Sequence, residues 1–176
     1  GLVRLQLDSN QITGTIPHVG SQTEYLSLSN NLIEGDLHMF KVMFGFGSLS
    51  HIDLSHNRIS GTIPPLLASQ TIASFVDLSY NQLEGTVPSF PRMDSENGKL
   101  ILAHNNFTAI GAPFSAPYLD LSYNLFRGSL RRKTFTEART LLLAGNRLTG
   151  LFSGPHFPYI ESLDLSHNRF VVDFSK

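Results

Sequence analysis

Short runs of alternating apolar and polar residues recur along this chain at a nearly constant interval. The stretch Ile52–Pro64 shows the unit, in which Ile52 and Leu54 alternate with Asp53 and Ser55. This period of two predicts a β-strand with one buried face. A strand so short is not stable alone, so we expect copies of it to stack against one another.

Eight copies align on an asparagine that follows the strand, in the pattern L-x-L-x-x-N-x-L, with Ile, Val or Phe at some apolar positions. The asparagines are Asn10, Asn31, Asn57, Asn81, Asn105, Asn124, Asn146 and Asn168. They are 21, 26, 24, 24, 19, 22 and 22 residues apart. One match would be weak evidence, but eight in phase predict a solenoid in which each repeat contacts only its neighbours.

A second motif closes most of the repeats. The form G-x-[IV]-P occurs at Gly14–Pro17, Gly61–Pro64 and Gly85–Pro88, and forms without proline occur at Gly35–Leu37, Gly128–Leu130 and Gly150–Phe152. The fifth repeat departs from the pattern, with Ala109 in place of the glycine. Together the two motifs resemble the plant-type class of leucine-rich repeat, which occurs in receptor-like proteins, receptor kinases and secreted inhibitor proteins of plants. The resemblance covers essentially all 176 residues.

The resemblance implies an α/β solenoid of about eight coils. Its parallel β-sheet would form the concave face, the convex side would be mostly irregular or in short strands, and helices would be few. We predict a single domain over residues 1–176, and we interpret it as a piece of a longer array because neither end has a recognisable cap. The degraded connectors and the short spacing before Asn124 predict irregular curvature.

The eight asparagines are predicted to be structural. A side-chain amide offers two donors and an acceptor, which can pair the backbone groups left free where the chain leaves each strand. Stacked in register from coil to coil, these side chains would form a ladder along the solenoid.

The outward strand positions and the turns after them are expected to share the concave face. The aspartates there match the repeat's own D-L-S-[HY]-N pattern, which favours a scaffold role. Ile101 and Leu142 are more informative, because large exposed apolar groups on a stable rod usually have a partner. Aromatic and histidine side chains beside them suit a binding surface. The predicted partner-binding residues are His56, Phe75, Tyr80, Ile101, His104, Tyr123 and Leu142.

Catalysis is not predicted. His51, Asp53 and Ser55 have the composition of a hydrolase triad. Alternate side chains on one strand are about 7 Å apart and project in parallel, however, whereas a triad needs successive contacts. The seven histidines show neither H-x-x-x-H nor H-E-x-x-H spacing, so we predict no metal and no cofactor.

Charge, apolar content and the absence of cysteine bear on which partners and sites the protein can have. Residues 1–88 carry three basic and seven acidic groups, and residues 89–176 carry ten basic and seven acidic groups. This imbalance is too small to indicate nucleic acid. No stretch approaches the roughly 18 apolar residues that a membrane span needs. The absence of cysteine excludes disulfides and thiolate metal sites.

We therefore expect non-catalytic recognition of a protein or peptide ligand, as the resemblance to the extracellular regions of receptor-like proteins implies. That resemblance also implies an extracellular or cell-surface location, although Gly1–Pro17 is already a repeat and not a signal peptide. One alternative is a structural subunit of a larger extracellular or organelle-associated assembly. Another is ice binding, which the uneven repeat spacing disfavours.

Three further features have open interpretations. Asn106 begins the sole N-x-[ST] sequon and is a glycosylation candidate if the protein is secreted. The apolar segment His38–Ser48 either covers the core or docks a partner. The basic cluster Arg131–Lys133 is either a solvated connector or a contact for an acidic partner.

Overall fold

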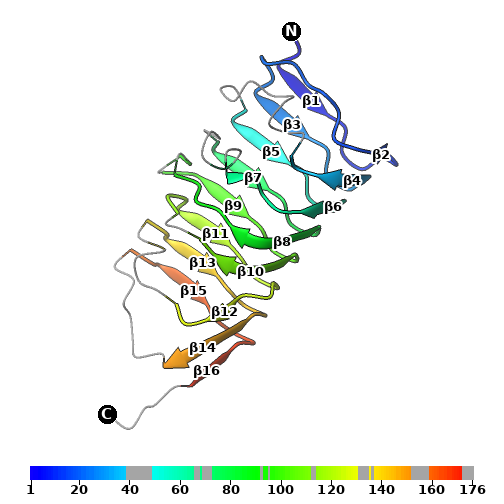
Figure 1. The fold of residues 1–176 in the computed structure, drawn as a ribbon. Coiled ribbons are helices and arrows are strands. Elements are labelled where there is room, and N and C mark those ends of the chain that lie inside the picture. The colour runs from blue at the N-terminus through cyan, green and yellow to red at the C-terminus, as the bar shows by residue number, and fades with distance from the viewer. Residues whose placement is uncertain are drawn as a thin grey trace.

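Eight short parallel strands form one continuous sheet, with one strand from each repeat (Figure 1). In chain order they are β1 (Arg4–Gln6), β3 (Tyr25–Ser27), β5 (His51–Asp53), β7 (Phe75–Asp77), β9 (Lys99–Ile101), β11 (Tyr118–Asp120), β13 (Thr140–Leu142) and β15 (Ser162–Asp164). The computed structural model describes residues 1–38, 49–65, 68, 73–91, 93–94, 96–111, 114–130, 135, 137–151 and 159–171. Because sheet neighbours are successive repeats, the predicted leucine-rich-repeat solenoid is confirmed.

Short strands also line the opposite side of the coils (Figure 1). One parallel sheet contains β2 (Thr13–Gly14), β4 (Leu32–Asp36), β6 (Arg58–Gly61), β8 (Gln82–Val87) and β10 (Asn106–Ile110). Another contains β12 (Arg127–Gly128), β14 (Arg147–Leu151) and β16 (Arg169–Val171). The break between these two sheets lies between β10 and β12. It coincides with the shortest repeat interval, the 19 residues from Asn105 to Asn124.

Glycine closes most coils in a left-handed conformation. Gly85 has a φ of 80°, and a Cβ added there would lie 3.0 Å from Cγ2 of Thr62 in the preceding coil. Both the backbone and the neighbouring side chain therefore favour glycine. Ala109 occupies the matching position of the fifth repeat. There the pairing of β10 with β8 shifts register between Phe107 and Ala109, so a β-bulge replaces the glycine bend.

The hydrophobic core lies between the eight-stranded sheet and the strands opposite. Leu26 and Leu100 in the eight-stranded sheet, and Leu54 directly after β5, point inward and are fully buried. Burial of each such side chain stabilises the fold by about 1.5–3 kcal/mol relative to exposure. The end coils are less covered, since Leu5 and Leu163 are only partly buried. Each interior coil thus depends on both neighbours for its stability.

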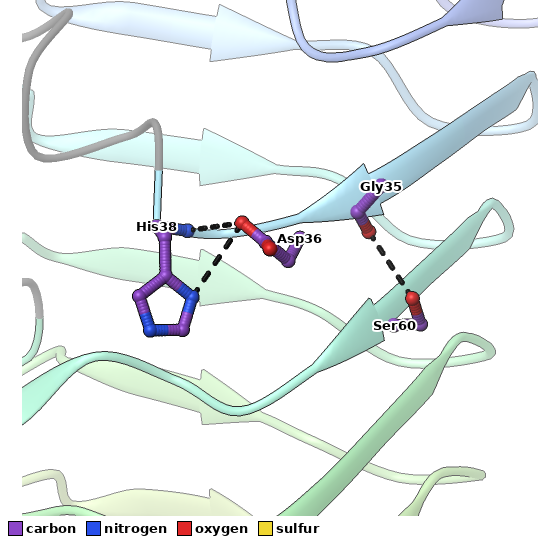
Figure 2. Close-up of polar contacts among 4 residues, drawn as sticks. All are labelled: Gly35, Asp36, His38 and Ser60. Carbon is purple, nitrogen blue, oxygen red and sulfur yellow. Dashed lines mark hydrogen bonds and ion pairs between the residues drawn. The ribbon is translucent and has the colours of Figure 1, made fainter.

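Polar contacts order the edge where β4 meets β6 (Figure 2). The hydroxyl of Ser60 donates to the carbonyl of Gly35 at 3.4 Å. Oδ1 of Asp36 accepts the backbone N–H of His38 at 2.8 Å and lies 3.5 Å from Nδ1 of the same histidine. Because both side chains are exposed, these contacts shape the turn more than they stabilise the fold.

Two segments with open interpretations fall outside the described residues. Only His38 of the apolar segment His38–Ser48 is described, and the basic cluster Arg131–Lys133 is not described at all. Within the described part of the chain, no helix has the length and apolar character needed to cross a membrane.

Candidate binding face

The strands of the eight-stranded sheet pair in perfect register, so equivalent side chains line up in rows across the sheet. Two rows lie on the strands, and a third lies on the turns that follow them. Arg4 pairs with Tyr25, Tyr25 with His51, and His51 with Phe75, and the same alignment continues through β15. The middle row consists of Gln6, Ser27, Asp53, Asp77, Ile101, Asp120, Leu142 and Asp164. We call this side of the sheet the outer face.

Aspartates of the middle row hold the turn that follows each strand. Oδ1 of Asp77 accepts the backbone N–H of Ser79 at 2.8 Å and its hydroxyl at 2.6 Å. Burial raises the pKa of Asp77, while the bonds from Ser79 lower it and the neighbouring Asp53 carboxylate raises it further. The same serine bonds recur at Asp53 and Asp120. These carboxylates therefore serve the scaffold, as a charged hydrogen-bond acceptor does at a buried turn.

After each turn the chain enters the left-handed region. The non-glycine residues there have φ values between 51° and 56°. They are Ser9, Asn30, His56, Tyr80, His104, Tyr123 and His167. Such values are uncommon for residues with a Cβ and persist only where surrounding bonds hold them. The bonds are visible: the N–H of Tyr80 donates to the Ala103 carbonyl at 2.9 Å, and that of Tyr123 donates to the Ala144 carbonyl at 2.7 Å.

Four of these left-handed residues place their rings in one stack, which we call the long stack. The ring centroids of His56 and Tyr80 are 4.1 Å apart, those of Tyr80 and His104 are 4.1 Å apart, and those of His104 and Tyr123 are 4.4 Å apart. Interplanar angles stay between 11° and 14°. Tyr80 and Tyr123 nevertheless remain 45% and 50% exposed. The stack is therefore a rigid aromatic ridge with its ring edges in solvent.

A second stack, the short stack, lies on the other side of the middle row. His51 lies between Tyr25 and Phe75, with centroid distances of 4.1 and 4.4 Å and interplanar angles of 7°. Arg4 covers the far face of Tyr25, with Cζ 3.4 Å from the ring centroid. Burial lowers the pKa of His51, although the Asp53 carboxylate acts in the opposite direction. This arrangement favours a neutral imidazole between two rings.

The asparagines of the repeat link every coil to the one before it. Nδ2 of Asn105 donates to the Leu78 carbonyl of the preceding coil at 2.9 Å, and its Oδ1 accepts the backbone N–H of Leu83 at 2.9 Å. Nδ2 also lies 3.3 Å from the carbonyls of Leu102 and Ala103 in its own coil. The same bonds to the preceding coil recur at Asn31, Asn57, Asn81, Asn124, Asn146 and Asn168.

This geometry agrees with the comparison to known families. The model of the Leucine Rich Repeat family matches residues 48–70, which include the repeat around Asn57. The solved structures that match the fold include receptor ectodomains of the same repeat type, such as the Arabidopsis receptor kinase HAESA. The family match and the solved receptor structure support a leucine-rich-repeat protein of the plant type. No curated protein sequence matches it.

Three solved structures show what this leucine-rich-repeat chain is similar to. A plant ice-binding protein is 26% identical with a TM-score of 0.77, and the match covers 96% of this chain and 58% of that one. The Arabidopsis receptor kinase HAESA, in complex with the peptide hormone IDA and the co-receptor SERK1, is 27% identical with a TM-score of 0.63. That match covers 96% of this chain and 34% of HAESA. The PEPR1–AtPEP1 complex is 24% identical with a TM-score of 0.74, and the match covers 93% of this chain and 24% of that one. The chain therefore spans little more than half of the ice-binding protein, about a third of HAESA and about a quarter of PEPR1.

The structure distributes the predicted partner-binding residues of this repeat protein over three rows. His56, Tyr80, His104 and Tyr123 are contiguous in the long stack. Ile101 and Leu142 lie in the middle row, separated by Asp120. Phe75 belongs to the short stack, on the opposite side of the middle row. Sequence reasoning selected neither Tyr25 nor His51 as a binding residue, although strand alignment alone places both beside Phe75.

The contacts of His51, Asp53 and Ser55 do not form a hydrolase triad. In a triad the histidine lies between the nucleophile and the carboxylate. Here the Ser55 hydroxyl donates directly to Asp53 at 2.7 Å, while the His51 ring is stacked between Tyr25 and Phe75. Among the residues that the structure describes, no group of three or more His, Cys, Asp or Glu side chains could hold a metal ion.

The sequon at Asn106 lies on the side of the coils opposite the outer face. Asn106 is exposed at the start of β10 and pairs with Glu84 of β8. The hydroxyl of Thr108 donates to the Gly85 carbonyl at 3.2 Å. A modification here would therefore leave both aromatic stacks uncovered.

Proposed function

We propose that the protein is a non-catalytic recognition module that binds a protein or peptide through its outer face. The observation that carries the proposal is the long stack, whose four rings stand beside Ile101 and Leu142. Rigid aromatic groups supply contact area at little cost in conformational entropy, which is why binding surfaces are rich in them. The HAESA complex, which contains a peptide hormone and a co-receptor, supports this class of partner.

The exposure of the stacks supports a role beyond stability. A ring that served only the core would be covered on its edges as well as its faces. Tyr80 has both ring faces covered, by His56 and His104, and is still 45% exposed. Stacking thus fixes the position of the ring while its hydroxyl end stays in water, as a pre-organised contact requires. By its likeness to receptor structures we place the module outside the cell or on its surface.

A pull-down from native extract tests this proposal. The test variant combines Tyr80→Ala, Ile101→Asp, Tyr123→Ala and Leu142→Asp. A matched control changes exposed residues on the opposite strands, Glu34→Ala, Arg58→Ala and Glu84→Ala. Circular dichroism checks that both variants fold.

We expect a partner that binds the wild type and the control to be lost from the test variant. Retention of the same partner by the test variant would contradict the proposal. The ends or the opposite strands would then be the contact surface, and a structural role in an assembly would explain the protein better.

Ice binding is the second candidate function, because one of the similar structures is a plant ice-binding protein. Ice recognition favours a flat and repetitive surface. The exposed threonines directly after closing glycines are Thr15, Thr62 and Thr86, but Asp36 interrupts this row and Ser129 follows Gly128. Thermal hysteresis of the purified protein tests this candidate. Activity lost on changing all three threonines to valine would favour ice binding over peptide recognition.

A further inference from the structure

The long stack ends at Tyr123 because the next left-handed position is a glycine. Gly145 has a φ of 66° and belongs to the same row as His104, Tyr123 and His167. A Cβ added at Gly145 would lie only 2.6 Å from Cδ1 of Tyr123, so this ring leans over the glycine. No ring contact joins Tyr123 to His167 among the described residues. We call the space on the free face of the Tyr123 ring, on the side towards His167, the Gly145 gap.

Among the described residues, only His104 stacks on the Tyr123 ring, and Tyr123 remains 50% exposed. Rings within the long stack are 4.1–4.4 Å apart. A single flat side chain from a partner can therefore continue the stack from the free face of Tyr123 at the same spacing.

The middle row beside the Gly145 gap carries one apolar residue between two acidic ones. Leu142 is half-buried in the middle row, and Ala144 is 5% exposed. Leu142 pairs with Asp120 on one side and Asp164 on the other. Each aspartate accepts a backbone N–H from its serine at 2.9 Å, through Oδ1. A carboxylate accepts about four hydrogen bonds, so both keep acceptor capacity for a ligand.

The chain already closes its other stack with a guanidinium group. Arg4 lies over Tyr25 with Cζ 3.4 Å from the ring centroid. Its Nη2 donates to Oε1 of Gln6, a member of the middle row, at 3.0 Å. At the Gly145 gap the corresponding elements are the Tyr123 ring and the Asp120 and Asp164 carboxylates. The same contacts there would be stronger, because the acceptors are charged.

We propose that the Gly145 gap is a recognition site for an arginine side chain of the partner. The guanidinium stacks on Tyr123, the methylene stem lies on Leu142 and Ala144, and the N–H groups bond to Asp120 or Asp164. A lysine has the charge without the plane, and an aromatic residue has the plane but leaves the carboxylates unpaired. This inference rests on the proposed function and names one determinant of its specificity.

The test uses a small probe and needs no native partner. Acetyl-Gly-Arg-Gly-amide is titrated into the wild type at pH 7.5, and the Gly145 amide and Tyr123 ring signals are followed by NMR. Peptides with citrulline or lysine in place of arginine separate planarity from charge. We expect either replacement to weaken binding by about tenfold, the size of a desolvated cation–π contact.

Two variants locate the probe. Gly145→His adds a side chain that occurs in this row at His56, His104 and His167, but its Cβ must displace the Tyr123 ring. It should therefore weaken binding about tenfold. Asn30→His adds the same side chain in the same row far from the gap, and it should bind as the wild type does. The combined variant Asp120→Asn/Asp164→Asn, which keeps acceptors for Ser122 and Ser166, should abolish the preference for arginine over citrulline. This aspartate variant also tests the site if Gly145→His fails to fold.

Three outcomes would overturn the inference: no binding of the arginine peptide, equal binding of the citrulline peptide, or unchanged binding by a folded Gly145→His variant. The proposed function is judged separately. Suppose that a native partner binds Gly145→His and the wild type equally but does not bind the four-residue outer-face variant. That result would contradict the arginine site and still support the recognition role.

Discussion

Replacing Asn105 with alanine should destabilise the protein far more than the same change at Asn10. Asn105 is 6% exposed and pairs two backbone groups of the preceding coil, the Leu78 carbonyl and the Leu83 N–H. Leu83 is itself fully buried, so water cannot readily replace the lost bond. Each buried group left unpaired costs about 1–3 kcal/mol, so two of them should cost about 2–6 kcal/mol.

Asn10 provides the matched control because the structure describes no preceding coil to which its side chain could bond. Its Nδ2 donates only to the carbonyls of Leu7 and Asp8 in its own coil, at 3.0 and 3.1 Å, and the residue is exposed. Water can take over these bonds, so Asn10→Ala should cost about 0.5–1.5 kcal/mol. A large difference between the two variants would identify the bonds between coils as the source of the stabilisation.

Urea unfolding followed by circular dichroism measures both free energies, and amide hydrogen exchange measures the local effect at Leu83. Asn105→Ala should remove much of the protection at Leu83 and leave distant coils less affected, because each coil contacts only its neighbours. Equal losses for the two variants, or full protection of Leu83 in Asn105→Ala, would refute the reasoning. Asn105→Asp adds a further check, since it keeps the acceptor but should be no more stable than the alanine variant.

Other predictions follow from the glycines, the short stack and the sequon. Gly85→Ala should lower the free energy of unfolding more than Gly128→Ala. Both glycines have φ near 80°, but only at Gly85 does a neighbour lie within 4 Å of the added Cβ. Urea unfolding of the two variants in parallel tests this. The folded-state pKa of His51 lies below its unfolded value of 6.5, so the wild type should lose stability relative to His51→Phe as pH falls through and below that value. Melting temperatures of both proteins between about pH 5 and pH 8 measure this, and a constant difference would contradict it. Protein secreted from eukaryotic cells should lose mass on glycosidase treatment only if Asn106 is intact, as Asn106→Gln would reveal.

The repeat pattern was sufficient to predict the sheet but not the grouping of side chains on it. The interval between asparagines fixes which strands are neighbours, and strand alignment then fixes the rows. Whether rings in a row stack depends on side-chain rotamers and on the backbone conformation of the turn. The left-handed φ of Tyr80 and Tyr123 was therefore not readable from the pattern, and Phe75 was grouped with residues that lie across the middle row from it.

In the first repeat, the bonds between an aspartate carboxylate and a serine are made by residues at different positions. Four later coils, those of Asp53, Asp77, Asp120 and Asp164, have aspartate in the middle row and serine two positions on, but here Gln6 and Asp8 take those places. Asp8 instead reaches the next coil, where its Oδ1 accepts bonds from the hydroxyls of Ser27 and Ser29. These bonds lower its pKa against the effect of burial. The carboxylate that bonds such a turn can thus come from the same coil or from the preceding one.

The left-handed turn connects stability with recognition in this protein. The turn is held by bonds that reach the next coil, such as that from the Tyr80 N–H to the Ala103 carbonyl. The same conformation directs the Tyr80 ring away from the core and against His56 and His104. Residues in this row are therefore constrained only to tolerate a positive φ and to stack. Their chemical identity is free to vary from coil to coil, as the change from Tyr123 to Gly145 demonstrates, and that freedom lets a regular scaffold present an irregular binding surface.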